Sequence, residues 1–213
     1  SRRQWRLQAI AGILLSALIL PVFVSVHSIV SWDFAAAMGV EGWHATIFAP
    51  YFVIGAIHSG VAAVVVVIAL MYWLFGWKRY IRPEHFDALG RLQLVVGIGW
   101  AFFFFLEFVF GLYTLGGPEV AVREMQVFQW PWSLLFGIFA VTAFLIPLSL
   151  WMFRSVRRSI LAMFLISMLL NVGMWLERFL IIVPGLARKT PFAFSWGNYV
   201  PSPIELTIVA MTF

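Results

Sequence analysis

Long apolar stretches and shorter polar segments alternate along the chain. Five of the apolar stretches are long enough to cross a hydrocarbon core of about 30 Å, for which about 20 helical residues suffice. They are Leu7–Val30, Phe48–Phe75, Leu92–Leu115, Trp132–Phe153 and Ile160–Val183. The pattern therefore predicts an all-α fold, a polytopic bundle with five complete transmembrane helices.

The segments between these stretches are polar or contain Gly and Pro, which is typical of connections between helices. They are Ser31–Ile47, Gly76–Arg91, Gly116–Pro131, Arg154–Ser159 and Pro184–Pro203. After the last connection, Ile204–Phe213 begins an apolar run that is too short to span a membrane. Because the chain also begins at Ser1 rather than at Met, we expect residues 1–213 to be a single transmembrane domain from a larger protein, with the start of a sixth helix at its end.

Lys and Arg are unevenly distributed among the connections. Most of the 14 such residues lie at the start of the chain or in the second and fourth connections. These are Arg2, Arg3, Arg6, Lys78, Arg79, Arg82, Arg91, Arg154, Arg157 and Arg158. The other connections contain only Arg123, Arg188 and Lys189. Since loops rich in Lys and Arg stay on the cytoplasmic side, this distribution predicts a cytoplasmic N-terminus.

The composition excludes several classes of protein. Hydrophobic residues make up 63% of the chain and charged residues 11%, and the mean hydropathy of +0.97 is far from that of a water-soluble domain. The net charge of +5 is not gathered on a basic face with polar surroundings, so we expect no nucleic acid partner. The absence of cysteine excludes thiolate-held iron–sulfur clusters and thiolate zinc sites within the chain, and we expect no metal site.

Ionisable side chains at membrane depth are the candidate functional residues, because a charge in the hydrocarbon region is costly and usually has a use. Counting helical rise from the outer helix ends places Glu107 about 12 Å deep and His58 about 15 Å deep. Six such groups fall in the outer half of the membrane: His27, Asp33, His58, Glu107, Glu177 and Arg178. Away from the helix ends, the inner half has only uncharged polar groups such as Gln93, Thr142 and Ser149. This distribution predicts a polar pocket that opens outward.

Charge neutralisation is the alternative explanation for these groups, since unpaired buried charges are not tolerated. Glu107 would then pair with Arg178 or His58. We expect Arg178 to pair with a carboxylate, either from Asp33 or Glu107 or from a residue outside this chain. Neighbouring residues on a helix point about 100° apart, so we expect Glu177 and Arg178 to have different partners.

A haem held by two histidines of this chain is disfavoured. Such a site needs both imidazoles at similar depth, and His27 and His58 differ by roughly 8 Å along the helical rise. His44 and His85 lie in connections on opposite sides of the membrane. We therefore expect no haem within the chain.

Four segments resemble one known family. The segments are 26–35 (VHSIVSWDFA), 42–52 (GWHATIFAPYF), 55–60 (GAIHSG) and 171–179 (NVGMWLERF). They resemble the NrfD (polysulfide reductase membrane subunit) family, and most closely the large membrane subunits of bacterial alternative complex III. The resemblance implies a multi-pass protein of the bacterial inner membrane that binds quinol near the outer face and has no redox cofactor of its own. It also implies three kinds of partner: a homologous NrfD-like membrane subunit, an iron–sulfur subunit and multihaem c-type cytochromes.

The resemblance assigns Asp33 and the Glu177–Arg178 pair to the quinol pocket or its proton outlet. Oxidation of a quinol or menaquinol releases two electrons and two protons, so the site needs hydrogen-bonding groups and a base. We expect Asp33 to accept a proton. We expect His27 to form a hydrogen bond with the quinol head group and to relay a proton. Trp32 would lie beside them, and Arg178 would orient a quinone oxygen.

We also expect His58, Glu107 and Glu177 to form a proton pathway.

A transporter or an ion or proton channel subunit is the main alternative function, and a cofactor-free membrane anchor for iron–sulfur and cytochrome subunits is another. A transporter should continue its polar groups into the inner half of the membrane. These helices lack such groups, which favours quinol oxidation.

Overall fold

The computed structural model describes residues 2–38, 40, 43, 45, 47–113, 117–186 and 202–211. The described part is helical and contains no strand. Five helical segments in it are long and apolar enough to cross a membrane, which confirms the predicted number and the all-α fold. The described elements are α1 (Arg2–Trp32), the π-helical η1 (Asp33–Met38), α2 (Phe48–Leu74), the 3₁₀ turn η2 (Trp77–Arg79), α3 (Pro83–Tyr113), α4 (Gly117–Phe128), α5 (Trp132–Phe139), the π-helical η3 (Ala140–Leu145), α6 (Ile146–Trp151), α7 (Arg154–Arg158), α8 (Ile160–Leu186) and α9 (Pro203–Met211).

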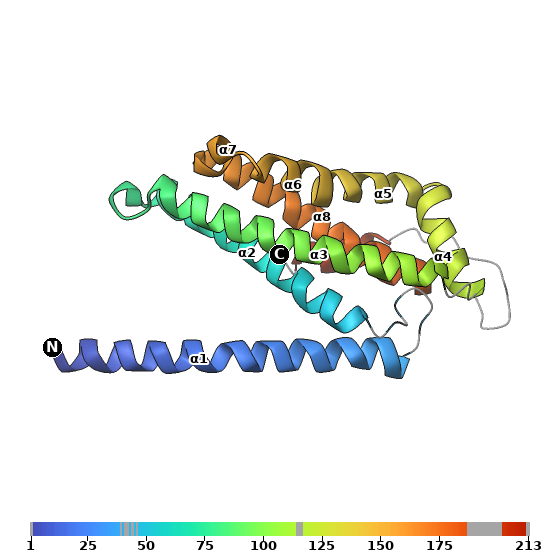
Figure 1. Ribbon diagram of the computed structural model, residues 1–213, viewed down its shortest axis with the longest axis horizontal. Helices are drawn as coiled ribbons and strands as arrows, with labels where there is room; N and C mark the ends of the chain where they lie inside the picture. The colour runs from blue at the N-terminus through green and yellow to red at the C-terminus, as the bar shows by residue number, and fades with distance from the viewer. Residues whose placement is uncertain are drawn as a thin grey trace.

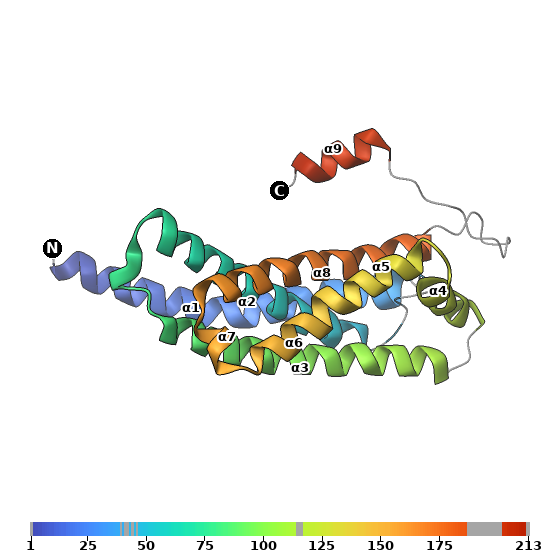
Figure 2. The same cartoon turned by 90° about the horizontal axis from the view of Figure 1, so that it is seen from above.

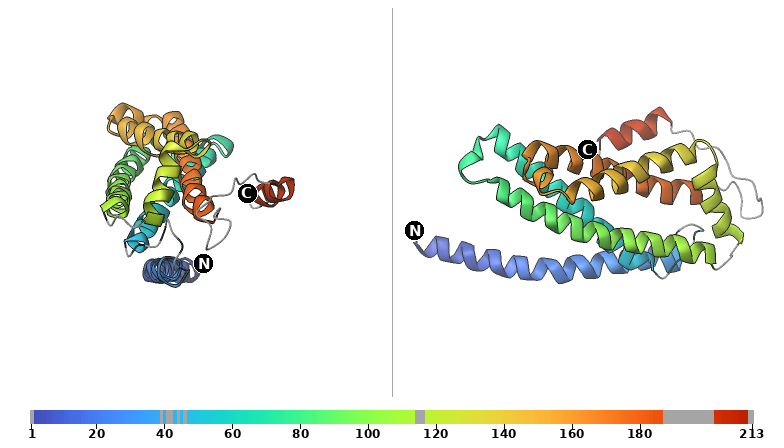
Figure 3. Two further views of the ribbon diagram at one scale, coloured as in Figure 1. Left: turned by 90° about the vertical axis from the view of Figure 1, so that its right-hand side faces the viewer. Right: turned by 45° about the horizontal axis from the view of Figure 1, so that its top comes forward.

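Four of the spans form a bundle, and the fifth lies at its edge. The bundle consists of α2, α3, α8 and the continuous span α5–η3–α6 (Figures 1 and 3). Large side chains fill its interior, among them Trp100, Phe139 and Trp151. By contrast, α2 approaches α1 at one end and slants away from it at the other, and the most apolar window of α1 is not buried within the chain (Figure 1). The polar groups of the bundle interior are therefore separate from those on α1.

The fourth span contains a π-helical segment where α8 packs closely against it. Pro147 lies in the first turn of α6 and has no backbone N–H to donate, so the regular hydrogen-bond ladder cannot continue through it. The hydroxyl of Thr142 in η3 donates to the Ile138 carbonyl at 2.8 Å. Gly173 of α8 faces this turn, and a Cβ there would lie 2.6 Å from Thr142 Oγ1. Gly173 thus permits the close helix contact that bundles in membranes favour.

The cation-rich segments gather at one end of the molecule. The N-terminal end of α1, the α2–α3 turn and α7 lie together there, and α4 lies at the opposite end (Figure 1). This segregation agrees with the alternation of connections inferred from the sequence. The side of the membrane that each end faces stays a prediction. Arg188, Lys189 and His44 lie outside the described residues.

The second connection is shorter than the sequence predicts, because α3 begins at Pro83 rather than at Leu92. Pro is favoured at the first helical position, and the acidic Glu84 follows in the first turn. The extension buries Asp87, which accepts hydrogen bonds from Arg157 Nε at 2.9 Å and from Arg91 Nη2 at 2.8 Å. The sequence placed Asp87 in a polar connection, whereas in the structure it joins α3 to α7.

The third connection also differs from its prediction as a non-helical segment. It contains α4, a 12-residue helix that lies across the end of the bundle opposite the N-terminus (Figure 2). One face of α4 is buried and includes Val122, Arg123, Met125 and Gln126. Spacings of three and four residues put these side chains on one helical face. α4 therefore caps the bundle.

Candidate functional site

Glu177 is the centre of a polar cluster inside the bundle. α8 places its side chain in the core, where the residue is 2% exposed. The Tyr51 hydroxyl of α2 donates to Glu177 Oε1, and the indole Nε1 of Trp100 on α3 donates to the same oxygen at 3.2 Å. Three helices thus hold one carboxylate, as a buried charge requires.

Arg178 extends this cluster toward the surface of the bundle. Its Nη1 lies 3.4 Å from Glu177 Oε2, and its guanidinium lies over the Phe52 ring with 4.4 Å between Cζ and the ring centroid. Gly55 provides the space, since a Cβ there would lie 2.7 Å from Arg178 Nη2. The Arg178 side chain is 25% exposed, although its Nη1 atom is buried, so part of the side chain is accessible from outside the core.

These contacts correct one expectation and confirm part of another. Glu177 and Arg178 were expected to have different partners, but they form an ion pair because the long Arg178 side chain turns back toward its neighbour. Arg178 does pair with a carboxylate, as expected. That carboxylate is Glu177 rather than Asp33 or Glu107.

Glu107 belongs to a second cluster, beneath α4. Arg123 Nη2 donates to Glu107 Oε1 at 3.2 Å, and Arg123 Nη1 donates to Gln126 Oε1 at 3.3 Å. Gln126 Nε2 in turn donates to the Leu180 carbonyl at 2.8 Å. The expected pairing of Glu107 with Arg178 or His58 is therefore wrong. Sequence reasoning missed Arg123 and Gln126 because it treated α4 as a connection, although their spacing in an amphipathic segment was a usable signal.

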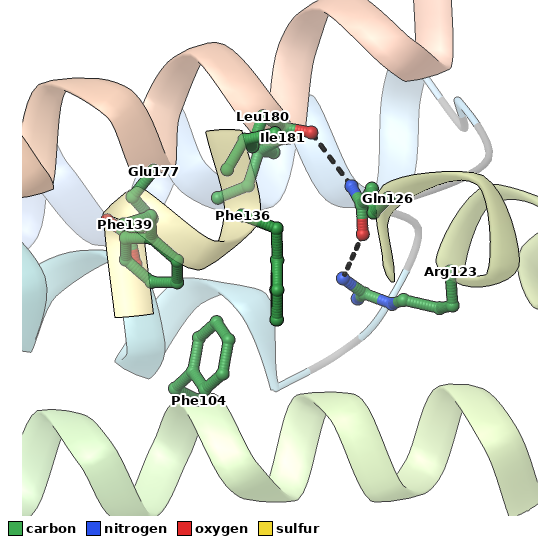
Figure 4. A pocket seen from close by; sticks show the side chains of 8 residues that line it. All are labelled: Phe104, Arg123, Gln126, Phe136, Phe139, Glu177, Leu180 and Ile181. Carbon is green, nitrogen blue, oxygen red and sulfur yellow. Dashed lines mark hydrogen bonds between the residues drawn. The ribbon is translucent and has the colours of Figure 1, made fainter. Parts of the chain in front are cut away.

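A small cavity separates the two clusters (Figure 4). Its volume is about 20 Å³, room for one or two water molecules but not for a quinone ring. Polar and aromatic side chains share its wall. The lining residues are Phe104, Arg123, Gln126, Phe136, Phe139, Glu177, Leu180 and Ile181.

His58 lies in the interior of the bundle and is fully buried. Gln93 Nε2 donates to the His58 carbonyl at 2.8 Å and lies 2.9 Å from His58 Nδ1. Because the amide nitrogen is a donor to both atoms, Nδ1 is the accepting nitrogen of the imidazole. The ring stacks on Trp100 with 5.4 Å between centroids. Trp100 therefore contacts both His58 and Glu177.

α3 contributes one residue to the Glu177 cluster, one to the Glu107 cluster and one to the contacts of His58, and all three lie on one helical face. Gln93, Trp100 and Glu107 follow one another at intervals of seven residues, or about 10 Å along the helix. Gln93 bonds to His58, Trp100 to Glu177, and Glu107 to Arg123. The predicted proton-pathway residues thus lie along one seam of the bundle.

His27, Trp32 and Asp33 lie on α1 and η1, away from this seam. His27 Nδ1 lies 3.0 Å from the Phe23 carbonyl of its own helix. Trp32 is 55% exposed, and Asp33 is exposed. Among the described residues, no hydrogen bond or ion pair joins His27 or Asp33 to Arg178. A quinol site shared by these residues stays a prediction.

Comparison with known proteins identifies the family. The family model described as "Polysulphide reductase, NrfD" matches residues 3–189, which include every candidate site residue. The chain belongs to the NrfD family. NrfD proteins are membrane subunits of quinol-linked oxidoreductase complexes and typically pair with iron–sulfur subunits. A search of curated proteins found no match to the chain.

Proposed function

We propose that this NrfD chain binds and oxidises quinol or menaquinol as the membrane subunit of a complex of the alternative complex III type. The observation that carries the proposal is the buried Glu177 carboxylate, held by Tyr51 and Trp100, beside the partly exposed Arg178 guanidinium. An inert anchor has no need of such a cluster, because a buried ion pair is rarely a net source of stability.

The chemistry of a quinol fits the groups that this cluster offers. The electrons must pass to partner subunits, since the chain has no cysteine to hold an iron–sulfur cluster. Those partners would be an iron–sulfur subunit and multihaem c-type cytochromes, beside a homologous NrfD-like subunit. The protons need a base, and Glu177 is the carboxylate that pairs with the partly exposed Arg178.

The quinol head group would bind outside the bundle core, on the α1 side of Arg178. The cavity beside Glu177 is too small for a quinone ring, whereas the Arg178 side chain is partly exposed. Arg178 would hold a quinone oxygen, and His27, Trp32 and Asp33 would complete the site from α1. The isoprenoid tail would lie along the apolar face of α1. With a cytoplasmic N-terminus, the site would lie near the outer face of the bacterial inner membrane, and the released protons would leave outward.

Substitution of Arg178 in the assembled complex tests the proposal. Arg178→Gln should raise the KM for quinol at least about tenfold, because it removes a charged hydrogen bond worth about 1.5–3 kcal/mol. Arg154→Gln is the matched control, since Arg154 is exposed at the opposite end of the bundle. Haem and iron–sulfur content and native gels would report assembly. An assembled Arg178→Gln complex with unchanged quinol kinetics would refute this site.

A further inference from the structure

α1 and α2 approach each other at one end of the molecule and diverge toward the end that carries the N-terminus (Figures 1 and 3). On α2, Ala49, Gly60 and Val67 share one helical face, because intervals of 11 and 7 residues are close to whole numbers of turns. Ala49 is 2% exposed at the end where the helices approach. Gly60 is exposed and Val67 is 50% exposed farther along. The α2 face is therefore uncovered within the chain where α1 has moved away.

α1 shows the same change in exposure along its length. His27, Leu20 and Ile13 follow one another at intervals of seven residues and lie close to one helical face. His27 is partly buried near the end where the helices approach, whereas Leu20 and Ile13 are 66% and 70% exposed. Arg6, seven residues before Ile13, is exposed at the end of this apolar stripe. We refer to the exposed apolar side chains of residues 7–22 and 60–74 as the diverging faces.

Positive charge without a carboxylate partner lies at the ends of these two faces. None of the cations there forms an ion pair among the described residues. They are Arg2, Arg3, Arg6, Lys78, Arg79 and Arg82. Residues 1–32 and 74–83 contain no Asp or Glu. By contrast, Arg91 and Arg157 both pair with Asp87 on α3. The excess positive charge is therefore concentrated beside the diverging faces.

We propose that the diverging faces bind anionic phospholipid, with its acyl chains along α1 and α2 and its phosphate among these cations. Basic residues beside membrane-spanning helices are typical of sites for anionic head groups. A quinol head group is uncharged and cannot balance this charge, and a protein partner would need carboxylates at the same level. Trp5 and Trp77 are 77% and 46% exposed near the cations, as is usual for side chains at head-group depth. The inference does not rest on the proposed function.

Photoreactive phospholipids test which molecule covers these faces. The purified complex is placed in phosphatidylcholine vesicles that contain a trace of phosphatidylglycerol or of phosphatidylcholine with the same diazirine-labelled acyl chain. After illumination, peptide mapping should place phosphatidylglycerol cross-links on residues 7–22 and 60–74, with at least about fivefold fewer from the phosphatidylcholine probe. Equal labelling by both probes would overturn the proposal, because it is the result for ordinary boundary lipid. Absence of labelling by either probe would also overturn it, since another protein segment would then cover the faces.

Substitution of single cations tests the charge requirement. Arg6→Gln and Arg79→Gln should each reduce phosphatidylglycerol labelling about fivefold, the loss expected for one cation near a membrane surface. Arg154→Gln is the matched control, because Arg154 is equally exposed at this end of the bundle but lies on α7, which packs on α3 and α8. Native gels would report assembly of all three variants. Unchanged labelling in Arg6→Gln or Arg79→Gln, or an equal loss in Arg154→Gln, would refute the site.

Quinol is the remaining competitor for these faces, since its isoprenoid tail is also apolar. Excess quinol should leave phosphatidylglycerol labelling unchanged in the unsubstituted complex. Displacement of the probe by quinol would refute the phospholipid site and assign the diverging faces to the quinol tail. Failure of quinol oxidation would refute the proposed function without changing the labelling, so the two proposals can fail separately.

Discussion

The guanidinium of Arg178 turns back on its own helix and lies 3.4 Å from the carboxylate of its neighbour Glu177. In this arrangement Glu177 Oε1 accepts hydrogen bonds from Tyr51 and Trp100, and the Arg178 side chain stays partly exposed. A buried carboxylate and a partly exposed cation are thereby paired on adjacent residues. A ligand that binds Arg178 would approach Glu177 without entering the bundle.

Removal of the Glu177 charge should therefore stop quinol chemistry without unfolding the chain. Glu177→Gln keeps an oxygen that accepts from Tyr51 and Trp100 but cannot take up a proton. We expect turnover to fall about 100-fold or more, in the range typical of a lost general base. Glu84→Gln is the control, because Glu84 is 61% exposed at the other end of the bundle. Normal turnover in an assembled Glu177→Gln complex would exclude Glu177 as the base.

Asp33 offers an independent test of the contribution of α1. Asp33→Asn should leave assembly intact, because Asp33 is exposed and has no ion pair among the described residues. If Asp33 accepts a proton from quinol, the rate of quinol-driven electron transfer should fall sharply, and Asp33→Glu should restore part of it. The measurement is steady-state reduction of the electron acceptor at saturating quinol. Unchanged rates in Asp33→Asn would remove Asp33 from the mechanism and confine the site to the bundle.

The sequence located the membrane spans that carry the buried polar groups, but not the pairings of those groups. Hydropathy and length located the five spans, and His58, Glu107 and Glu177 lie on these spans and are buried within the bundle. Depth does not specify how each helix is rotated about its axis, and so the partner of Glu107 was misassigned. That partner is Arg123, on a helix whose alternating polar and apolar residues made it look like a connection.

The Asp87 network shows the same limit at the other end of the bundle. Its charge looked compatible with a solvated connection, and only the contact with α7 shows that it is buried. Asp87→Ala should destabilise the chain by about 3 kcal/mol, because it leaves the buried part of Arg157 without its carboxylate. Glu84→Ala should cost under about 1 kcal/mol, since its partner Arg158 is itself exposed. Thermal unfolding of the two variants in detergent would separate these outcomes, and equal midpoints would show that the Asp87 contacts do not stabilise the fold.

Glu107→Gln separates three roles for the Glu107–Arg123 pair beneath α4. Loss of proton release with electron transfer preserved would place Glu107 on the proton pathway. Loss of both proton release and electron transfer would place Glu107 in quinol chemistry. If neither changes, Glu107 serves only to neutralise the charge of Arg123. We expect the first outcome, because Glu107 lies beneath α4 and, among the described residues, has no hydrogen bond or ion pair with Arg178. The measurement is proton release and acceptor reduction in the same vesicles.

The position of Arg178 can be tested without changing any charge. Gly55 lies against its guanidinium, and a Cβ at that position would come within 2.7 Å of Arg178 Nη2. The terminal guanidinium is the flexible partner in this contact, so Gly55→Ala should displace it while the bundle still assembles. We expect a KM for quinol raised several-fold with a smaller change in kcat. Gly60→Ala, on the same helix, is the matched control because nothing lies within 4 Å of a Cβ there. If both variants bind quinol equally well, the guanidinium does not contact the head group, and the ligand must be held by α1 alone.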